Sequence, residues 1–313
     1  SVAAVREVAR QYREAGCDAI LAVGGGSVLD TSKGVNILVT EGSDDLMAFS
    51  GAGALKRRLK PLIAVPTTSG TGSETTLVAV IKDAARQVKM TFVSHYLIPD
   101  AAVLDPRMTL TLPPHITAAT AMDALTHAME AYTCLAKNPQ SDAAALAAVA
   151  LIARHLPQVM ANPGDARGRL ALANAATLAG MAFSNTQNGL DHALALAIGG
   201  KFHLPHGLLT AFILPWVMEF NLIAAPKKFI EIAKAFGERT ERLSEIDAAR
   251  LSVKAVKGLL DDVGISCRLS SYGVPREEFP ALAKAAVGAV RLISNNPRSV
   301  TEPDVIGILE ANY

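Results

Sequence analysis

The sequence has few cysteines, almost no excess charge and no apolar run long enough to span a membrane. Its three cysteines are odd in number and widely separated, so they predict neither a disulfide framework nor a sulfur-ligated metal. A net charge of +1, from 30 basic and 29 acidic residues, excludes the electrostatic footprint of a nucleic-acid or anionic-membrane binder. The longest apolar stretch, 143–153, falls short of the roughly 20 residues that a membrane span needs. These absences favour a cytoplasmic protein whose partner is a small molecule.

The chain has the length and composition of a two-domain protein with a large core. It contains 313 residues, of which 50% are hydrophobic and 19% charged, so it exceeds the usual size of one simple domain. It has no internal repeat, low-complexity tract or obvious linker. We therefore predict two domains that meet closely, with the cleft between them as the natural ligand site.

The pattern of apolar residues changes once along the chain, near Pro106. Before this point strand-like runs alternate with helical or glycine-rich stretches, whereas after Pro113 Ala- and Leu-rich helices follow one another without a convincing strand. This pattern predicts an α/β domain over 1–106 and an all-α domain over 107–313. The expected strands are 18–23, 62–65, 75–81, 88–93 and 101–104, and the expected helix after the first of them is 28–39.

A glycine-rich turn follows the first expected strand and opens the helix after it. Unpaired amides at a helix N-terminus attract a negatively charged group, and the missing side chains let that group come close, so the turn is typical of a pyrophosphate site. The pattern is not the GxGxxG fingerprint, and a turn without a ligand is the alternative. The turn consists of Gly24, Gly25, Gly26 and Ser27.

A second loop, 66–74, combines hydroxyl side chains with glycines after another apolar run. Ligands of open α/β sheets bind outside the carboxyl ends of the strands. A solvated turn is the alternative for this loop alone. Two such loops, each following a strand, favour a long phosphorylated ligand that lies across the strand ends.

One carboxylate and three imidazoles in the second half of the chain form a candidate cage for a divalent metal. Asp123 and His127 are four residues apart, so on a helix both side chains leave the same face. His192 and His206 complete the set. Oxygen and imidazole ligands suit Fe(II) or Zn(II) without discriminating between them, and either ion acts as a Lewis acid on an alcohol or carbonyl oxygen. A lone histidine is more often a packing or surface residue, but that alternative weakens for four candidates together.

Several motifs, in order along the chain, resemble those of the iron-containing (group III) alcohol dehydrogenase family. The resemblance covers essentially the whole sequence. The motifs are Gly24 to Ser27 with Asp30 and Lys33, the loop 66–74, the run 121–132, the run 202–207, and Asn296 to Arg298.

The resemblance implies a Rossmann-like, dinucleotide-binding N-terminal domain and a helical domain with a divalent iron in the cleft. It places the family's metal ligands on Asp123, His127, His192 and His206. NAD is the implied hydride carrier, with NADP as the alternative, and zinc is the alternative metal. The implied reaction is hydride transfer between a small primary alcohol or aldehyde and the nicotinamide, in a homo-oligomer such as a dimer. The implied cofactor contacts are Gly24, Gly25, Gly26, Ser27, Asp30, Thr67, Thr68, Ser69, Thr71 and Lys89.

The sequence departs from the family pattern in two ways. Many members carry a second histidine four residues after the third ligand, close to the nicotinamide. This chain has Leu196 at that position, so the sequence does not identify the residue that acts as general acid and base. Family chains also carry further strands and helices ahead of the segment that matches Ser1, so the first strands of the expected sheet are missing. A metal-dependent lyase that resembles dehydroquinate synthase, and a catalytically weak scaffold or oligomer-forming member, are the alternative functions.

Other side chains near the candidate ligands have open roles. His203 either lines the cleft as a further catalytic group or only fills space. Asp191 either orients the imidazole of His192 or is solvated, and Glu130 is expected to pack nearby without ligating. Phe183, Phe202 and Trp216 are candidate apolar walls for the substrate, with core packing as the alternative for each of them.

Overall fold

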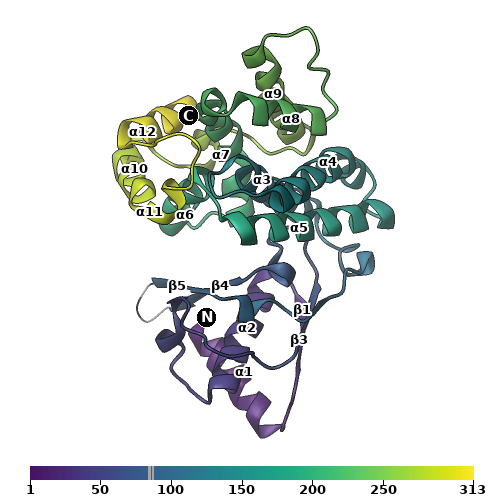
Figure 1. Ribbon diagram of the computed structural model, residues 1–313, viewed down its shortest axis with the longest axis vertical. Helices are drawn as coiled ribbons and strands as arrows, with labels where there is room; N and C mark the ends of the chain where they lie inside the picture. Colours follow the sequence, from purple (N-terminus) through teal and green to yellow (C-terminus); the bar gives the residue numbers. More distant parts are fainter. Residues whose placement is uncertain (84–85, 87) are drawn as a thin grey trace.

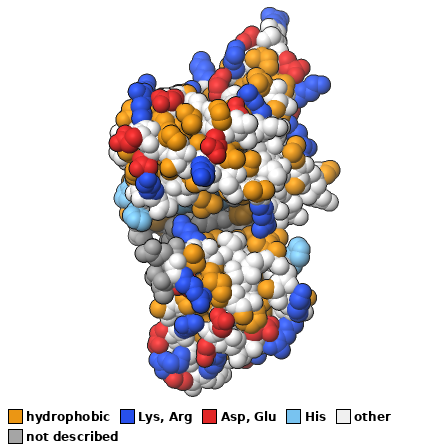
Figure 2. Space-filling view, turned by 90° about the vertical axis from the view of Figure 1, so that its left-hand side faces the viewer, with side chains coloured by type: hydrophobic (Ala, Val, Ile, Leu, Met, Phe, Trp, Pro, Cys, Tyr) orange, Lys and Arg blue, Asp and Glu red, His pale blue; other side chains and the backbone are white. Residues whose placement is uncertain are grey.

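The computed structural model describes residues 1–83, 86 and 88–313, and it has two lobes (Figure 1). A surface view shows the molecule hollowed between them (Figure 2). The α/β lobe contains α1 (Val2–Glu14), β1 (Ile20–Gly24), α2 (Gly26–Glu41), η1 (Leu46–Phe49), β2 (Gly51–Ala52), β3 (Leu62–Pro66), η2 (Ser73–Thr75), β4 (Val78–Asp83), β5 (Val88–Val93), η3 (His95–Leu97) and β6 (Ala101–Ala102).

The other lobe is helical throughout its described length, as the sequence predicts. After η4 (Pro106–Met108) it contains α3 (Pro114–Thr133), α4 (Pro139–Ala161), α5 (Ala166–Thr186), α6 (Leu190–Phe202), α7 (His206–Asn221), η5 (Leu222–Ala224), α8 (Pro226–Ala235), α9 (Glu245–Asp262), η6 (Leu269–Tyr272), η7 (Arg276–Glu278), α10 (Phe279–Gly288), α11 (Val290–Ile293) and α12 (Glu302–Ala311). The predicted fold class, an α/β region followed by an all-helical region, is confirmed.

A three-stranded parallel sheet sets the geometry of the α/β lobe. Its order is β1-β3-β6, and the register places Gly24, the last residue of β1, opposite Pro66, the last residue of β3. Helix α2 covers one face, where Ala22, Leu29 and Ala64 are buried. Since neighbouring parallel strands end at the same edge, the glycine-rich turn after β1 and the hydroxyl-rich loop after β3 emerge side by side.

A second sheet of order β2-β5-β4 packs against α1 and α2. Its antiparallel pair of β4 and β5 matches two expected strands, but the expected strand 75–81 starts only at Val78. Ser73–Thr75 forms a turn of 3-10 helix, and the backbone and hydroxyl of Thr76 bind a lysine instead of a neighbouring strand. The β-branched run was therefore too long as a strand prediction because its first residues serve tertiary contacts.

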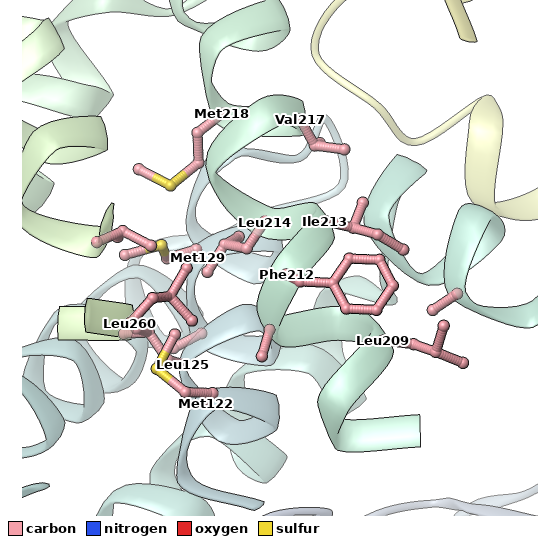
Figure 3. Close-up of a cluster of buried hydrophobic side chains, with 14 of the residues drawn as sticks. Met122, Leu125, Met129, Leu209, Phe212, Ile213, Leu214, Val217, Met218 and Leu260 are labelled. Carbon is pink, nitrogen blue, oxygen red and sulfur yellow. The ribbon is translucent and has the colours of Figure 1, made fainter. Parts of the chain in front are cut away.

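The core of the helical lobe forms around α3 and α7 (Figure 3). Met122, Leu125 and Met129 of α3 lie on the same side of α7 as Leu214 and Met218, and Phe212 points to the other side of α7. Every residue of α3 from Ala121 to Thr133 is buried, so this helix has no solvent face in its second half. A helix packed on all sides holds its polar side chains in fixed positions, which matters because Asp123 and His127 lie on this stretch.

Two helices are long and apolar enough to span a membrane by length and composition: Pro139–Ala161 and the continuous segment His206–Ala224. The longest uninterrupted apolar run, 143–153, makes up only part of the first of them. Core helices of globular domains pass the same criterion, and α7 lies in the centre of the buried cluster. Helix α4 packs along α3 and α5.

The loop after β3 joins the two lobes. Gly72 has a left-handed backbone (φ +61°), and a Cβ placed on it would lie 2.6 Å from the Cα of Gly180 on α5, so only glycine permits this approach. The Thr177 hydroxyl of α5 donates a hydrogen bond to Glu74 Oε1 at 2.7 Å. The Thr75 hydroxyl also donates to the Thr177 carbonyl. The hydroxyl-rich loop is thus attached to the helical lobe at several points.

A fully buried lysine stabilises the base of this loop. Lys33 Nζ donates to the carbonyl and hydroxyl oxygens of Thr76 and to the carbonyl of Val78. Burial lowers its pKa to about 8, against the opposing effect of the carboxylates of Asp30 and Glu74. Lys33 therefore links α2, the loop and β4 around one charge in the interior.

We expect Lys33 to make the stability of the protein depend on pH between about 8 and 10.5. Its folded-state pKa is below its ordinary value of 10.5, so in this window the unfolded chain binds more protons and the free energy of unfolding rises with pH. The slope from this group approaches about 1.4 kcal/mol per pH unit. Lys33→Met removes it. Denaturant unfolding of both proteins at several pH values should give curves that diverge, and parallel curves would contradict the prediction.

Candidate metal centre

Helix α3 presents two candidate ligands on one buried face. Asp123 and His127 are separated by one helical turn, and both residues are at most 5% exposed. His127 Nδ1 lies 4.0 Å from Asp123 Oδ2. The carboxylate also accepts a hydrogen bond at Oδ1 from the Thr210 hydroxyl of α7, at 3.1 Å. This bond fixes the rotation of the carboxylate so that its oxygens face the imidazoles.

The other two histidines come from the starts of α6 and α7. The ring of His192 stacks on that of His127, with centroids 4.6 Å apart. The ring of His206 lies edge-on to the ring of His192, with centroids 5.4 Å apart. His206 Nε2 is 3.7 Å from Asp123 Oδ1, and 44% of its side chain is exposed. The structure thus brings all four predicted ligands together, with His206 on the open side.

The arrangement fits a metal ion because buried nitrogen atoms lack partners. Asp123, His127 and His192 each offer a ligand atom, and these atoms lie within 4.8 Å of one another. Among the described residues, no group hydrogen-bonds to His127 Nδ1 or to His192 Nε2, although both atoms are buried. An unpaired buried polar atom is costly, so two of them beside a carboxylate indicate a site for a cation.

Glu130, one turn beyond His127, holds His192. The His192 Nδ1 atom lies 2.6 Å from Glu130 Oε2, and the backbone N–H of Asp191 donates to Glu130 Oε1 at 2.7 Å. The sequence offered Asp191 as the carboxylate that orients His192, but within the described part of the chain both carboxyl oxygens of Asp191 are buried without a hydrogen-bond partner. The spacing of three residues between His127 and Glu130 could have indicated this role for Glu130, since it puts both side chains on one helix face.

The electrostatics of the cluster keep the carboxylates of Asp123 and Glu130 ionised. Burial raises the pKa of Asp123, but the three neighbouring imidazoles outweigh it and lower the pKa overall. Burial likewise raises the pKa of Glu130, and His192 reverses the direction. Burial lowers the pKa of His127 to about 4, so its ring is neutral at physiological pH and has a lone pair for a metal. Burial raises the pKa of Asp191 well above its usual range, helped by the charges of Glu130 and Asp123.

An aromatic side chain and a glycine shape the cluster. The ring of Phe183, on α5, stacks on His127 at 4.4 Å, so one predicted apolar wall lies directly beside a candidate ligand. The other two candidates, Phe202 and Trp216, pack against the core of the helical lobe. A Cβ on Gly207 would lie 2.5 Å from the Ala119 carbonyl on α3. The absence of a side chain there lets the first turn of α7, with His206, approach Asp123.

The two candidate cofactor loops are in contact and lie next to the metal cluster. A Cβ on Gly25 would lie 3.2 Å from the Thr68 side chain, and a Cβ on Gly26 would lie 2.6 Å from that of Thr71. A Cβ on Gly70 would collide with Thr120, one turn before Asp123 on α3. The contact between the loops and α3 therefore places the strand ends within one helical turn of a candidate ligand.

The remaining predicted cofactor residues have different settings. Gly25 is the N-cap of α2, with Ser27 in the first turn, so the start of this helix lies beside the loop 67–71. Asp30 uses both carboxylate oxygens inside the chain, to the Ser73 hydroxyl and the Val80 amide. Ser69 is buried. The two hydrogen bonds of Asp30 give it a role in shaping the loop. Direct contact of Asp30 or Ser69 with a cofactor stays a prediction.

Lys89 and His203 are the last two predicted site residues. Enclosure in the cleft lowers the pKa of His206 against the effect of Asp123, and His192 and the ammonium of Lys89 lower it further. Lys89, on β5, is therefore near enough to a candidate ligand for its charge to influence that pKa. His203 is exposed at the end of α6 with a left-handed backbone (φ +54°).

Two family models match nearly the whole chain. The family model described as "Iron-containing alcohol dehydrogenase" matches residues 1–106. The model described as "Fe-containing alcohol dehydrogenase family, C-terminal" matches residues 117–313. The chain belongs to the iron-containing alcohol dehydrogenase family. The predicted family is therefore confirmed, and so is the predicted class of activity, oxidoreduction of alcohols and aldehydes.

Similar proteins cover the chain from end to end. The 1,3-propanediol dehydrogenase of Citrobacter freundii is 42% identical over 309 residues, which are 99% of this chain and 79% of the relative. The crystal structure of a 1,3-propanediol oxidoreductase superposes with a TM-score of 0.96 at 40% identity and covers 99% of this chain and 80% of that one. A sulfoacetaldehyde reductase from Bifidobacterium kashiwanohense in complex with NAD+ has a TM-score of 0.88 at 28% identity and covers 98% of this chain and 79% of its own. Iron, from the family, and NAD, from this relative, support the predicted cofactors.

Proposed function

We propose that this chain is an iron- and nicotinamide-dependent dehydrogenase of small primary alcohols, and a reductase of the matching aldehydes. The observation that carries the proposal is that two buried imidazole nitrogens beside the Asp123 carboxylate have no hydrogen-bond partner within the described chain. Thr120, one helical turn before Asp123, contacts the hydroxyl-rich loop 66–74. The four side chains proposed to hold the metal are Asp123, His127, His192 and His206.

Each part of the site has a separate task. A divalent metal held by these side chains supplies Lewis acidity for the oxygen of the substrate. The helix N-terminus at Gly25 and the amides and hydroxyls of the loop 67–71 bind the pyrophosphate of the nicotinamide dinucleotide. The ring of Phe183 excludes water from one side of His127. The ammonium of Lys89 binds the cofactor ribose at the other side of the cleft.

The finer features of the protein are part of the same proposal. The domain division at 106/107 coincides with the gap between the two family matches. A cytoplasmic location is supported by the free thiols of all three cysteines. A homo-oligomer, in the first instance a dimer, is supported by apolar side chains exposed on the open face of the parallel sheet, Leu21, Val23 and Ile63. The propanediol relative supports a small primary alcohol as substrate.

Metal analysis and a nicotinamide assay on the same preparation test the proposal. Protein purified without oxygen should contain iron, and 1,3-propanediol with NAD+ or NADP+ should raise the absorbance of the reduced nicotinamide. A metal-free protein that cannot be loaded would contradict the ligand set. Metal without nicotinamide reduction for any small alcohol would contradict the reaction.

We expect Leu196→His to raise the rate of alcohol oxidation near neutral pH. Leu196 lies one turn beyond His192 on α6 and is 44% exposed, so an imidazole there fits without displacing the core. It could carry a proton between substrate and water, a role typically worth on the order of a hundredfold or more. The pH profile of the rate should gain an ionisation with a pKa of about 6.5. Leu243→His, at a similarly exposed leucine between α8 and α9, is the control, and an unchanged profile for Leu196→His would rule out this role.

A further inference from the structure

Helix α6 begins without a capping side chain of its own. Its N-cap is Gly189, so within the described chain no local side chain accepts hydrogen bonds from its first amides. Glu130, which comes from α3, supplies this acceptor: its Oε1 accepts from the amide of Asp191 at 2.7 Å. A carboxylate at a helix N-terminus also interacts favourably with the helix dipole. One oxygen of Glu130 therefore fixes where α6 starts relative to α3.

The second oxygen of Glu130 is used on His192. Its Oε2 lies 2.6 Å from His192 Nδ1. A carboxylate has only acceptor sites, so the hydrogen of this bond belongs to Nδ1. A neutral imidazole carries one N–H, and with the hydrogen on Nδ1 the lone pair is on Nε2. That nitrogen is the buried, unpartnered atom that faces His127 and Asp123.

The carboxylate of Glu130 has little freedom to move. Its residue is only 7% exposed. A Cβ on Gly189 would lie 3.2 Å from Glu130 Oε1 and 3.6 Å from the side-chain oxygen of Asn296. Asn295 holds the segment before α6, because its side-chain amide donates to the backbone carbonyls of Thr186 and Asn188. The two hydrogen bonds of Glu130 are therefore parts of one rigid junction.

We propose that Glu130 is a positioning residue that selects the metal-binding tautomer of His192 and aims its Nε2 atom at the ion. The inference rests on the proposed function, since it assumes that His192 is a ligand. Glu130 itself does not touch the metal or the substrate. Hydrogen bonds of this kind raise the affinity of a metal site because the ligand is held in one orientation and one protonation pattern.

Glutamine at this position separates the tautomer role from a merely structural one. Its single side-chain oxygen can still accept from the Asp191 amide, which keeps the junction with α6. Its amino group then faces His192 Nδ1 and donates to it, so the hydrogen of the imidazole moves to Nε2 and blocks the ligand lone pair. Glu130→Gln thus preserves shape and removes the selection of the tautomer.

We expect Glu130→Gln to weaken Zn2+ binding about ten- to a hundredfold, measured by competition with a chromophoric chelator. The thermal midpoint of the metal-free protein should stay close to wild type. The matched control is Glu219→Gln, which removes an exposed carboxylate from α7 and should bind Zn2+ like wild type. Equal affinities for Glu130→Gln and Glu219→Gln would overturn the proposal.

Imidazole nitrogen NMR gives a second readout that a structural role would not change. In metal-free wild-type protein labelled with 15N-histidine, Nδ1 of His192 should have the shift of a protonated nitrogen, and in Glu130→Gln that of an unprotonated one. An unprotonated Nδ1 in the wild type would also overturn the proposal. His192→Ala assigns the signal and separates the two hypotheses: undiminished Zn2+ affinity in His192→Ala contradicts the proposed ligand set, whereas a loss there with none in Glu130→Gln contradicts only the role of Glu130.

Discussion

His206→Ala is expected to lose its metal and its alcohol dehydrogenase activity together while it keeps its fold. His206 is the first residue of α7 and the most exposed of the four candidate ligands, so its truncation leaves the buried core of α3 and α7 intact. Losing a hydrogen bond that supports a ligand typically costs a metal site up to about a hundredfold in affinity. The loss in His206→Ala should be larger, because the substitution removes a direct ligand. Activity should fall in proportion to the remaining metal.

The measurement is metal content after anaerobic purification and dialysis, with circular dichroism as the check on the fold. His155→Ala serves as the control, because His155 lies on α4 and hydrogen-bonds to Gln158 on the same helix. His192→Ala should behave like His206→Ala. A full equivalent of metal retained in both ligand variants would refute the proposed metal site.

Gly25→Val is expected to raise the dissociation constant for the nicotinamide dinucleotide at least about tenfold, which corresponds to about 1.4 kcal/mol. Gly25 has an ordinary backbone conformation (φ −77°), so valine causes no local strain there. Its side chain would instead fill the space in which the helix N-terminus faces the loop of Thr68, since even a Cβ lies 3.2 Å from that side chain. The phosphate groups then lose their close approach to the amides.

Calorimetric titration of NAD+ into the metal-loaded protein measures this effect. Gly258→Ala, a change on α9 where an added Cβ meets nothing within 4 Å, is the matched control. Metal content should be the same in wild type and both variants, which separates cofactor binding from metal binding. An unchanged affinity in Gly25→Val would mean that the stretch Gly24 to Ser27 is only a turn.

Much of the architecture follows from local sequence patterns. The apolar run 62–65 and the alternating run 88–93 predict strands that the structure has as β3 and β5, because apolar periodicity reports which face of an element is buried. The helix expected over 28–39 lies within α2. The spacing of four between Asp123 and His127 depends on helix geometry alone, so the sequence was sufficient to put them on one face.

The tertiary structure decided the contacts between residues far apart in the chain. Glu130 and His192 are separated by 62 residues, and nothing in the local pattern of either predicts their hydrogen bond. The same holds for Lys33. Lysine is rarely fully buried, but the structure buries this one against the backbone carbonyls of Thr76 and Val78.

The physical reason for this division is the range of the interactions. Strand and helix patterns record the burial of apolar side chains, which repeats with the period of the element itself and is readable in a short window. The partner of a buried polar group depends on which elements the core brings together, so it is set only when α3, α6 and α7 have packed. The sequence by itself determined the elements, the family and the candidate ligands. Only the packing decided that Glu130, and not Asp191, holds His192.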